Sequence, residues 1–240
     1  MPEHPRGTAG RIFALVGAES TGKSTLAEAL ALRLAADTGL SCTWVPEYLR
    51  EWCAREARTP RIDEQAAIAD EQARRIDAAA ATHDLVIADT TPLMTAVYHR
   101  QVFADRSLDA AALRWQRRCQ LTLLTALDLP WQADGLQRDG PQVQVPVDSA
   151  LRELLRIGDL PYAVVAGSGS RRLDSALDAI GGALRHLRAP RDGLQRRLLQ
   201  RDAERAASES AWRGVCKHCD APDCEHAAFR LRRAASLQGD

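Results

Sequence analysis

The segment GAESTGKST at residues 17–25 constrains this chain more than any other feature. Four residues lie between its two glycines, and Lys23 and Ser24 follow directly, which is the complete Walker A spacing. The apolar run RIFALV precedes it at residues 11–16, and Leu- and Ala-rich sequence follows over residues 24–36. Strand, glycine loop and helix in this order predict a loop that binds nucleotide phosphates.

Each part of this loop has a predicted task. Gly17 and Gly22 let the backbone curl so that successive N–H groups and the next helix N-terminus point at phosphate oxygens. Lys23 neutralises the β and γ phosphates, and Ser24 offers a hydroxyl to Mg²⁺. We expect ATP contacts from the whole loop, namely Gly17, Ala18, Glu19, Ser20, Thr21, Gly22, Lys23, Ser24 and Thr25. A chance match in a glycine-rich turn is the alternative, which the flanking strand and helix disfavour.

Further short apolar runs indicate an α/β fold. They lie at residues 41–45, 85–88, 121–127 and 162–166. The segments between them have the pattern of amphipathic helices, the clearest at residues 63–81, 147–157 and 171–187. Five strands alternating with helices predict a five-stranded parallel sheet in a three-layer P-loop NTPase sandwich, like that of nucleoside and nucleotide kinases.

Composition indicates a globular chain of 240 residues, 45% hydrophobic and 27% charged, with Lys plus Arg equal to Asp plus Glu at 32 each. No run approaches the roughly 20 apolar residues that cross a bilayer, and MPEHPRGTAG lacks a secretory signal, so we predict a cytoplasmic protein. After residue 190 the sequence turns rich in Arg, Gln, Asp and Ala. We therefore expect a disordered N-terminus (1–9), a P-loop kinase-like ATP-binding domain (10–189) and a helical tail (190–240).

Ligands of open parallel sheets gather at the C-terminal ends of the strands. Glu47 and Arg50 follow the second apolar run and can converge on a polar substrate, although ordinary helix-surface charges explain them equally well. Asp89 follows the third run, where a carboxylate holds the Mg²⁺ shell or accepts a hydroxyl proton; a helix cap is the alternative.

The fourth and fifth runs are also followed by informative segments. Arg138 lies in LPWQADGLQRDG, which is suited to a lid over the phosphates, with a solvated surface loop as the alternative. Arg118 is a weaker alternative for the lid cation. GSGSRR at residues 167–172 is small enough to let a purine ring lie close to the backbone, and an ordinary turn explains it almost as well.

Taken together, GAESTGKSTL, PEYLREW, a strand ending in Asp89 and DGLQRDG resemble the ribosylnicotinamide kinase domain of the bacterial NAD-biosynthesis regulator and its AAA-type P-loop relatives. The resemblance covers residues 10–187. Its more particular features are the ES pair inside the loop, the EYxRE string that begins at Glu47, and the Asp134-Gly135 pair.

The resemblance implies transfer of the ATP γ-phosphoryl group to the ribose 5′-hydroxyl of nicotinamide riboside, with Mg²⁺. It implies that this reaction is catalysed by Lys23, Asp89 and Arg138. It implies substrate contacts from Glu47, Tyr48 and Arg50, and Mg²⁺ ligation by Ser24 and Asp89.

The tail carries a separate motif, WRGVCKHCDAPDCEH. Its four soft or borderline ligands, Cys216, Cys219, Cys224 and His226, suit a closed tetrahedral Zn²⁺ site that would stabilise a segment too short to bury a core. His218 could replace His226, and reduced thiols without metal are the alternative.

The leading functional hypothesis is a kinase for a small, nucleoside-like substrate. A regulatory P-loop ATPase coupled to a partner at the tail is one alternative. A nucleic-acid-associated ATPase with a zinc-binding tail is the other, supported by the local arginines of residues 190–240 and opposed by the zero net charge. We expect nucleotide and small-molecule partners and no membrane, and the sequence leaves homo-oligomerisation open.

Overall fold

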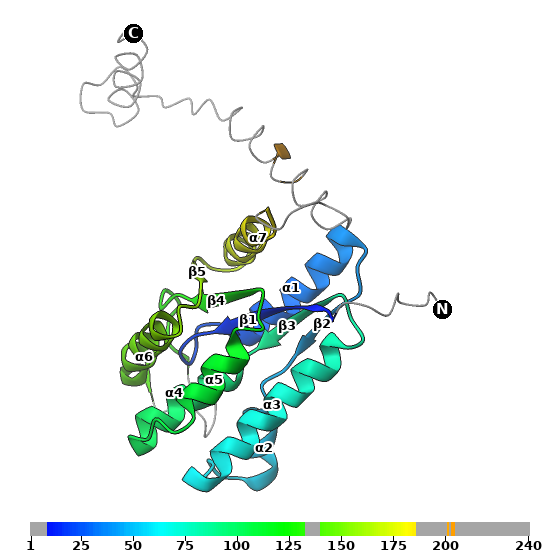
Figure 1. Cartoon of the computed structure of the whole chain (residues 1–240). Coiled ribbons are helices and arrows are strands. Elements are labelled where there is room, and N and C mark those ends of the chain that lie inside the picture. Colours follow the sequence, from blue (N-terminus) through cyan, green and yellow to red (C-terminus); the bar gives the residue numbers. More distant parts are fainter. Residues whose placement is uncertain (1–8, 133–139, 186–200, 202, 205–240) are drawn as a thin grey trace, which may run out of the picture. The chain divides into compact units, whose positions relative to one another are not determined.

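The computed structural model describes residues 9–132, 140–185, 201 and 203–204. Five strands form a single parallel sheet in the order β2-β3-β1-β4-β5, which confirms the predicted fold class (Figure 1). The strands are β1 (Arg11–Val16), β2 (Cys42–Val45), β3 (Leu85–Asp89), β4 (Leu121–Thr125) and β5 (Tyr162–Val165).

The central strand is β1, which pairs with β3 on one side and β4 on the other. Leu15 aligns with Asp89 in β3 and with Leu123 in β4. Because all strands are parallel, the loop after Val16 and the carboxylate of Asp89 leave the sheet at the same edge. This edge is where open parallel sheets bind their ligands.

Helices cover both faces of the sheet. They are α1 (Lys23–Thr38), α2 (Tyr48–Glu56), α3 (Gln65–Ala80), α4 (Pro92–Phe103), α5 (Asp109–Gln116), α6 (Gln144–Ile157) and α7 (Ser170–Arg185), with short 3₁₀ turns η1 (Ile62–Glu64) and η3 (Pro141–Val143). Figure 1 shows α1 and α7 on one face and α3 to α6 on the other. The sequence predicts α3, α6 and α7 with bounds within three residues where the structure describes them; η1 takes the start expected for α3, and α6 begins at Gln144 instead of Val147.

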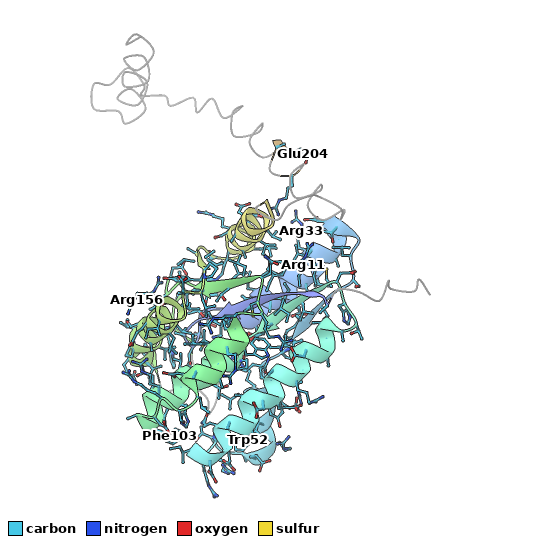
Figure 2. All side chains as sticks on the ribbon, viewed as in Figure 1. Arg11, Arg33, Trp52, Phe103, Arg156 and Glu204 are labelled. Carbon is cyan, nitrogen blue, oxygen red and sulfur yellow. The ribbon has the colours of Figure 1, made fainter. Side chains whose placement is uncertain are left out.

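The two covered faces explain the almost uninterrupted apolar run of β1, because a strand buried on both sides needs no polar face. Phe13 and Leu15 pack with Leu30 of α1 in one core. Val16 joins the opposite core with Leu151 of α6. Figure 2 shows charged side chains such as those of Arg33 and Arg156 on the outside of the molecule.

Within the described part of the chain, no helix combines the length and apolarity needed to cross a membrane. The predicted N-terminal segment 1–9 and the boundary near residue 190 fall almost wholly outside the described residues. Both stay predictions.

Two leucines of α1 provide a test of this layering. Leu30 is fully buried and Leu32 is 68% exposed. We expect Leu30→Ala to lower the free energy of unfolding by about 2–5 kcal/mol, because it removes buried methyl groups and leaves a cavity. The matched Leu32→Ala variant should stay within about 0.5 kcal/mol of wild type. Urea unfolding followed by circular dichroism measures both, and equal losses would contradict the proposed face of α1.

Candidate functional site

The loop between β1 and α1 depends on its glycines. Gly17 has φ +151° and Gly22 has φ +75°, both in the region that favours glycine. A Cβ atom at Gly17 would lie 2.0 Å from Oγ1 of Thr125, at the end of β4. The first glycine of the motif is therefore required by close packing against the neighbouring strand as well as by its backbone angle.

Local side chains hold the first turn of the loop. The Ala18 carbonyl accepts hydrogen bonds from Oγ1 of Thr21 and from Nζ of Lys23, both at 2.8 Å. Oγ1 of Thr21 also lies 2.7 Å from Oγ1 of Thr125, which in turn donates to the Val16 carbonyl at 3.3 Å. The loop is thus bonded to itself and to β4.

Side chains distant in sequence hold two further carbonyls of the loop. Nε2 of Gln144 donates to the Glu19 carbonyl at 2.8 Å, and Nη2 of Arg172 donates to the Thr21 carbonyl at 2.8 Å. In a planar trans peptide the C=O and the following N–H point in opposite directions. Because these carbonyl groups are held on one side of the loop, the N–H groups that follow them point to the opposite side. Several N–H groups that point to the same side form a site for an anion.

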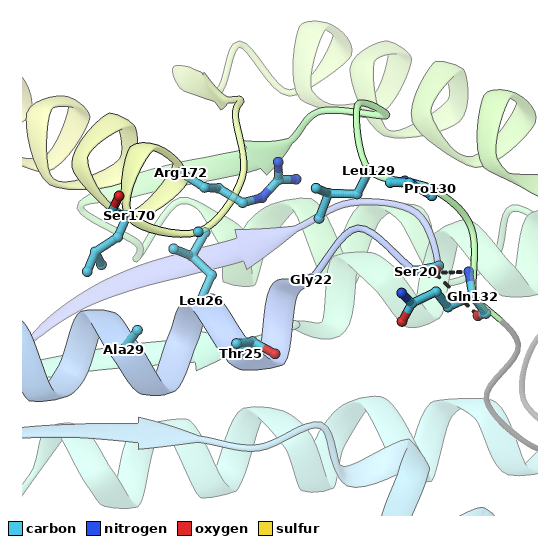
Figure 3. Close-up of a pocket in the computed structure, with 12 residues that line it drawn as sticks. Ser20, Gly22, Thr25, Leu26, Ala29, Leu129, Pro130, Gln132, Ser170 and Arg172 are labelled. Carbon is cyan, nitrogen blue, oxygen red and sulfur yellow. Dashed lines mark hydrogen bonds between the residues drawn. The ribbon is translucent and has the colours of Figure 1, made fainter.

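The tip of the loop contacts the segment after β4. Oγ of Ser20 accepts a hydrogen bond from the Gln132 amide at 2.7 Å and lies 3.3 Å from the Gln132 carbonyl (Figure 3). Ser20 has φ +58°, which is uncommon for a residue other than glycine. The tip is held in this conformation by a partner more than a hundred residues away.

Charged groups converge next to the loop. Burial lowers the pKa of the half-buried Lys23 ammonium, while Glu47 and Asp89 act to raise it. Burial raises the pKa of the Asp89 carboxyl, whereas a hydrogen bond from Ser24 lowers it. Asp89 is 1% exposed, and its Oδ1 has no hydrogen-bond partner among the described residues. The structure thus brings together the predicted residues Lys23, Ser24 and Asp89.

The three residues expected to bind substrate divide between two environments. Nε of Arg50 lies 3.1 Å from Oε2 of Glu47, and Arg50 faces the loop across a cavity of about 160 Å³. The centre of the Tyr48 ring instead lies 4.3 Å from the guanidinium carbon of Arg75 on α3. The backbone amide of Tyr48 donates a hydrogen bond to Oε1 of Gln72 at 2.7 Å. Glu47 and Arg50 are placed near the loop, while Tyr48 packs between α2 and α3.

A larger cavity of about 550 Å³ adjoins the loop (Figure 3). It is lined by Ser20, Gly22, Thr25, Leu26, Ala29, Leu129, Pro130, Gln132, Gly169, Ser170, Arg172 and Leu173. The walls combine apolar side chains of α1, α7 and the segment after β4 with the small residues of GSGSRR. This volume and largely apolar lining suit an aromatic base beside a phosphate-binding loop.

A narrow crevice of about 10 Å³ lies beyond Asp89, formed by α2, α3 and α4. Its lining residues are Glu47, Leu49, Ile68, Gln72, Thr90, Met94, Thr95 and Tyr98. Thr90 has φ +70°, a strained angle for a β-branched residue, and its amide donates to the Leu15 carbonyl at 3.1 Å. Such strain is often found where a side chain must be aimed at a ligand.

Several predicted site residues lie outside the described residues, and their roles stay predictions: Asp134, Gly135, Arg138, Cys216, Cys219, Cys224 and His226. Among the described residues, no group of three or more His, Cys, Asp or Glu side chains could hold a metal ion. Arg118, the weaker alternative for the lid cation, forms an exposed ion pair with Asp77 of α3 at 2.9 Å.

Sequence reasoning missed four residues that hold the loop or its partners, namely Thr125, Asp128, Gln144 and Arg172. The contacts of Thr125, Gln144 and Arg172 with the loop span more than a hundred positions, and Asp128 acts through Arg172, so spacing along the chain gives no signal for them. Arg172 belongs to the GSGSRR segment, where the small residues are the visible signal and nothing in the sequence marks the arginine itself.

The loop and the sheet order place the chain among nucleotide-binding P-loop proteins with a kinase-like fold. A family model described as an AAA domain matches residues 12–172, and the chain belongs to this family. The match supports nucleotide binding by a phosphotransferase or ATPase.

Two similar solved structures are those of NadR protein in complex with NR and of NadR protein in complex with NAD and AMP-PNP. The first has a TM-score of 0.58 and 18% identity, and covers 76% of this chain and 52% of its own. The second has a TM-score of 0.57 and 17% identity, and covers 76% and 51%. This chain therefore spans about half the length of those proteins, whose fold confirms the predicted resemblance. A search of curated proteins finds no match.

Alanine substitutions at two glycines with positive φ distinguish an effect on the shape of the loop from an effect of backbone strain alone. We expect Gly17→Ala to reduce nucleotide affinity at least about a hundredfold, because its Cβ would displace Thr125 and distort the loop. Gly39→Ala also meets a positive φ, +70°, but has open space around it. It should cost about 1 kcal/mol of stability and leave affinity unchanged. Isothermal calorimetry with a magnesium nucleotide distinguishes the two, and equal affinities would contradict this account.

Proposed function

We propose that this chain is an ATP-dependent kinase that phosphorylates a nucleoside-like small molecule, with nicotinamide riboside as the first candidate. The observation that carries the proposal is the position of Asp89. The buried carboxylate of Asp89 lies beside Ser24 and Lys23 of the loop. The next residue in the sequence, Thr90, lines the crevice between α2, α3 and α4. A phosphate donor and an acceptor can therefore meet at one carboxylate.

ATP fits the larger cavity and the loop together. In this proposal the adenine lies against Leu26, Leu129 and Leu173, and the phosphates follow the loop toward Lys23. Lys23 donates to a carbonyl of the loop itself, so a bound phosphate would replace that acceptor. The exchange keeps the ammonium hydrogen-bonded in both states.

The residues also fit Mg²⁺. The hydroxyl of Ser24 and the unpartnered, buried Oδ1 of Asp89 are oxygen ligands of the kind that this ion prefers, and one or two protein ligands suffice. When bound, Mg²⁺ offsets negative charge on the phosphates.

The proposed reaction is an in-line transfer. The acceptor hydroxyl oxygen forms a bond to the γ-phosphorus while the bond to the β–γ bridging oxygen breaks, and ADP leaves. Asp89 orients the hydroxyl and accepts its proton. Lys23 and Arg138 offset charge on the transferred group, with Arg138 assigned from sequence alone.

The acceptor side is formed by Glu47, Arg50 and the crevice. Hydroxyl, amide and carboxylate groups of Thr90, Gln72 and Glu47 can bind sugar hydroxyls, and Met94 supplies an apolar wall. The crevice has room for about one water, so acceptor binding requires α2 and α4 to move apart at this point. Nicotinamide riboside is favoured by the sequence resemblance. The zinc site of the tail stays a prediction from sequence.

Activity assays test the proposal directly. ATP consumption should rise strongly when nicotinamide riboside or one member of a nucleoside panel is added, with a phosphorylated product detected by mass spectrometry. Asp89→Asn should lower kcat by about 10²- to 10⁴-fold, because it removes the proton acceptor. The surface variant Asp37→Asn should keep wild-type kcat. Hydrolysis that no acceptor stimulates would favour a regulatory ATPase instead.

The predicted lid cation has its own test. Arg138→Ala should lower kcat by about a hundredfold or more with little change in substrate KM, because the positive charge acts on the transferring group. Arg118→Ala, which breaks a surface ion pair with Asp77, should leave kcat unchanged. If the Arg118 variant lost activity and the Arg138 variant kept it, the two assignments would be reversed.

A further inference from the structure

Arg172, in the first turn of α7, is the most extensively bonded side chain next to the phosphate loop among the described residues. It is 4% exposed. Its Nη1 donates to Oδ1 of Asp128 at 2.7 Å and to the Gly167 carbonyl at 2.6 Å. Its Nη2 donates to the Thr21 carbonyl at 2.8 Å and to the Ala126 carbonyl at 3.2 Å. A single guanidinium thus links the loop to the ends of β4 and β5.

Asp128 completes this arrangement. Its carboxylate also accepts the Gly167 amide at 2.6 Å, so it bonds both to Arg172 and to the turn after β5. Burial raises the pKa of the Asp128 carboxyl, but the hydrogen bonds from Arg172 and Gly167 outweigh this and lower it. The carboxylate is therefore charged and fixes the direction of the guanidinium fork.

The bond to Thr21 matters because Gly22 follows it. Glycine permits a wide range of φ, so the peptide between Thr21 and Gly22 can rotate at low cost unless something holds it. In the observed orientation Arg172 holds the carbonyl outward, so the Gly22 N–H points to the opposite side. A flipped peptide would turn a carbonyl oxygen toward the phosphates and replace attraction with repulsion.

We propose that Arg172 is a positioning residue of the phosphate loop, which holds the Thr21–Gly22 peptide in the orientation that binds phosphate. The inference rests on the proposed function only in requiring that the loop binds a nucleotide. Lysine cannot replace the planar fork, because a single ammonium cannot reach the four acceptors that Nη1 and Nη2 share.

The test compares two ligands in three variants. We expect Arg172→Lys to weaken binding of magnesium ATP and of inorganic tripolyphosphate by a similar factor of about ten or more, because both ligands use the loop. Asp128→Asn, which leaves the arginine in place, should weaken both by about threefold. The neighbouring Arg171 is exposed, so Arg171→Lys should bind both ligands as wild type does. Calorimetry at a temperature well below each melting midpoint gives the affinities.

The outcomes separate the possible roles. Loss of affinity for ATP alone, with tripolyphosphate unaffected, would make Arg172 a wall of the large cavity and overturn the proposal. A lower melting temperature with unchanged affinity for both ligands would make it a purely structural residue and also overturn it. If Arg172→Lys does not fold, unchanged affinities in Asp128→Asn decide against the proposal. A wild-type protein that binds neither ligand would instead refute the proposed function.

Discussion

The site depends on the hydrogen bonds that keep the carbonyl groups of the phosphate loop directed away from the phosphates. A glycine-containing loop can adopt many shapes, and only one side of its peptides can bind anions. Here Gln144 and Arg172, which lie outside the loop, each bind one of its carbonyl groups. The sheet supplies the frame, because β1 lies at its centre and delivers the loop between the ends of β3 and β4.

Two opposing effects set the pKa values of Asp89 and Lys23. Burial raises the pKa of the Asp89 carboxyl and lowers that of the Lys23 ammonium, which favours the neutral form of each. Nearby charges and hydrogen bonds act in the opposite direction and favour the charged forms. A magnesium nucleotide would bring both anions and a cation to this group. The arrangement is therefore suited to a ligand that carries charges of both signs.

The fold was predictable because its signals are local. Apolar runs, helix periodicity and the Walker A spacing each lie within a few consecutive residues, and they gave the sheet and the loop with Lys23, Ser24 and Asp89. The missed residues act through long-range contacts. Thr125 and Arg172 have no motif of their own, and their importance follows from atoms that meet only in the folded chain. Likewise, nothing in EYLRE indicates that the Tyr48 ring packs on Arg75.

The distance in sequence between the loop and its supports has a consequence for protein synthesis. Residues 17–22 are synthesised more than a hundred residues before Thr125, Gln144 and Arg172, which hold the loop. A domain generally folds as a unit during synthesis, once its chain is available. The nascent chain thus contains the complete Walker A sequence before the loop can fold into its phosphate-binding conformation. We expect nucleotide to bind only after α7 has left the ribosome.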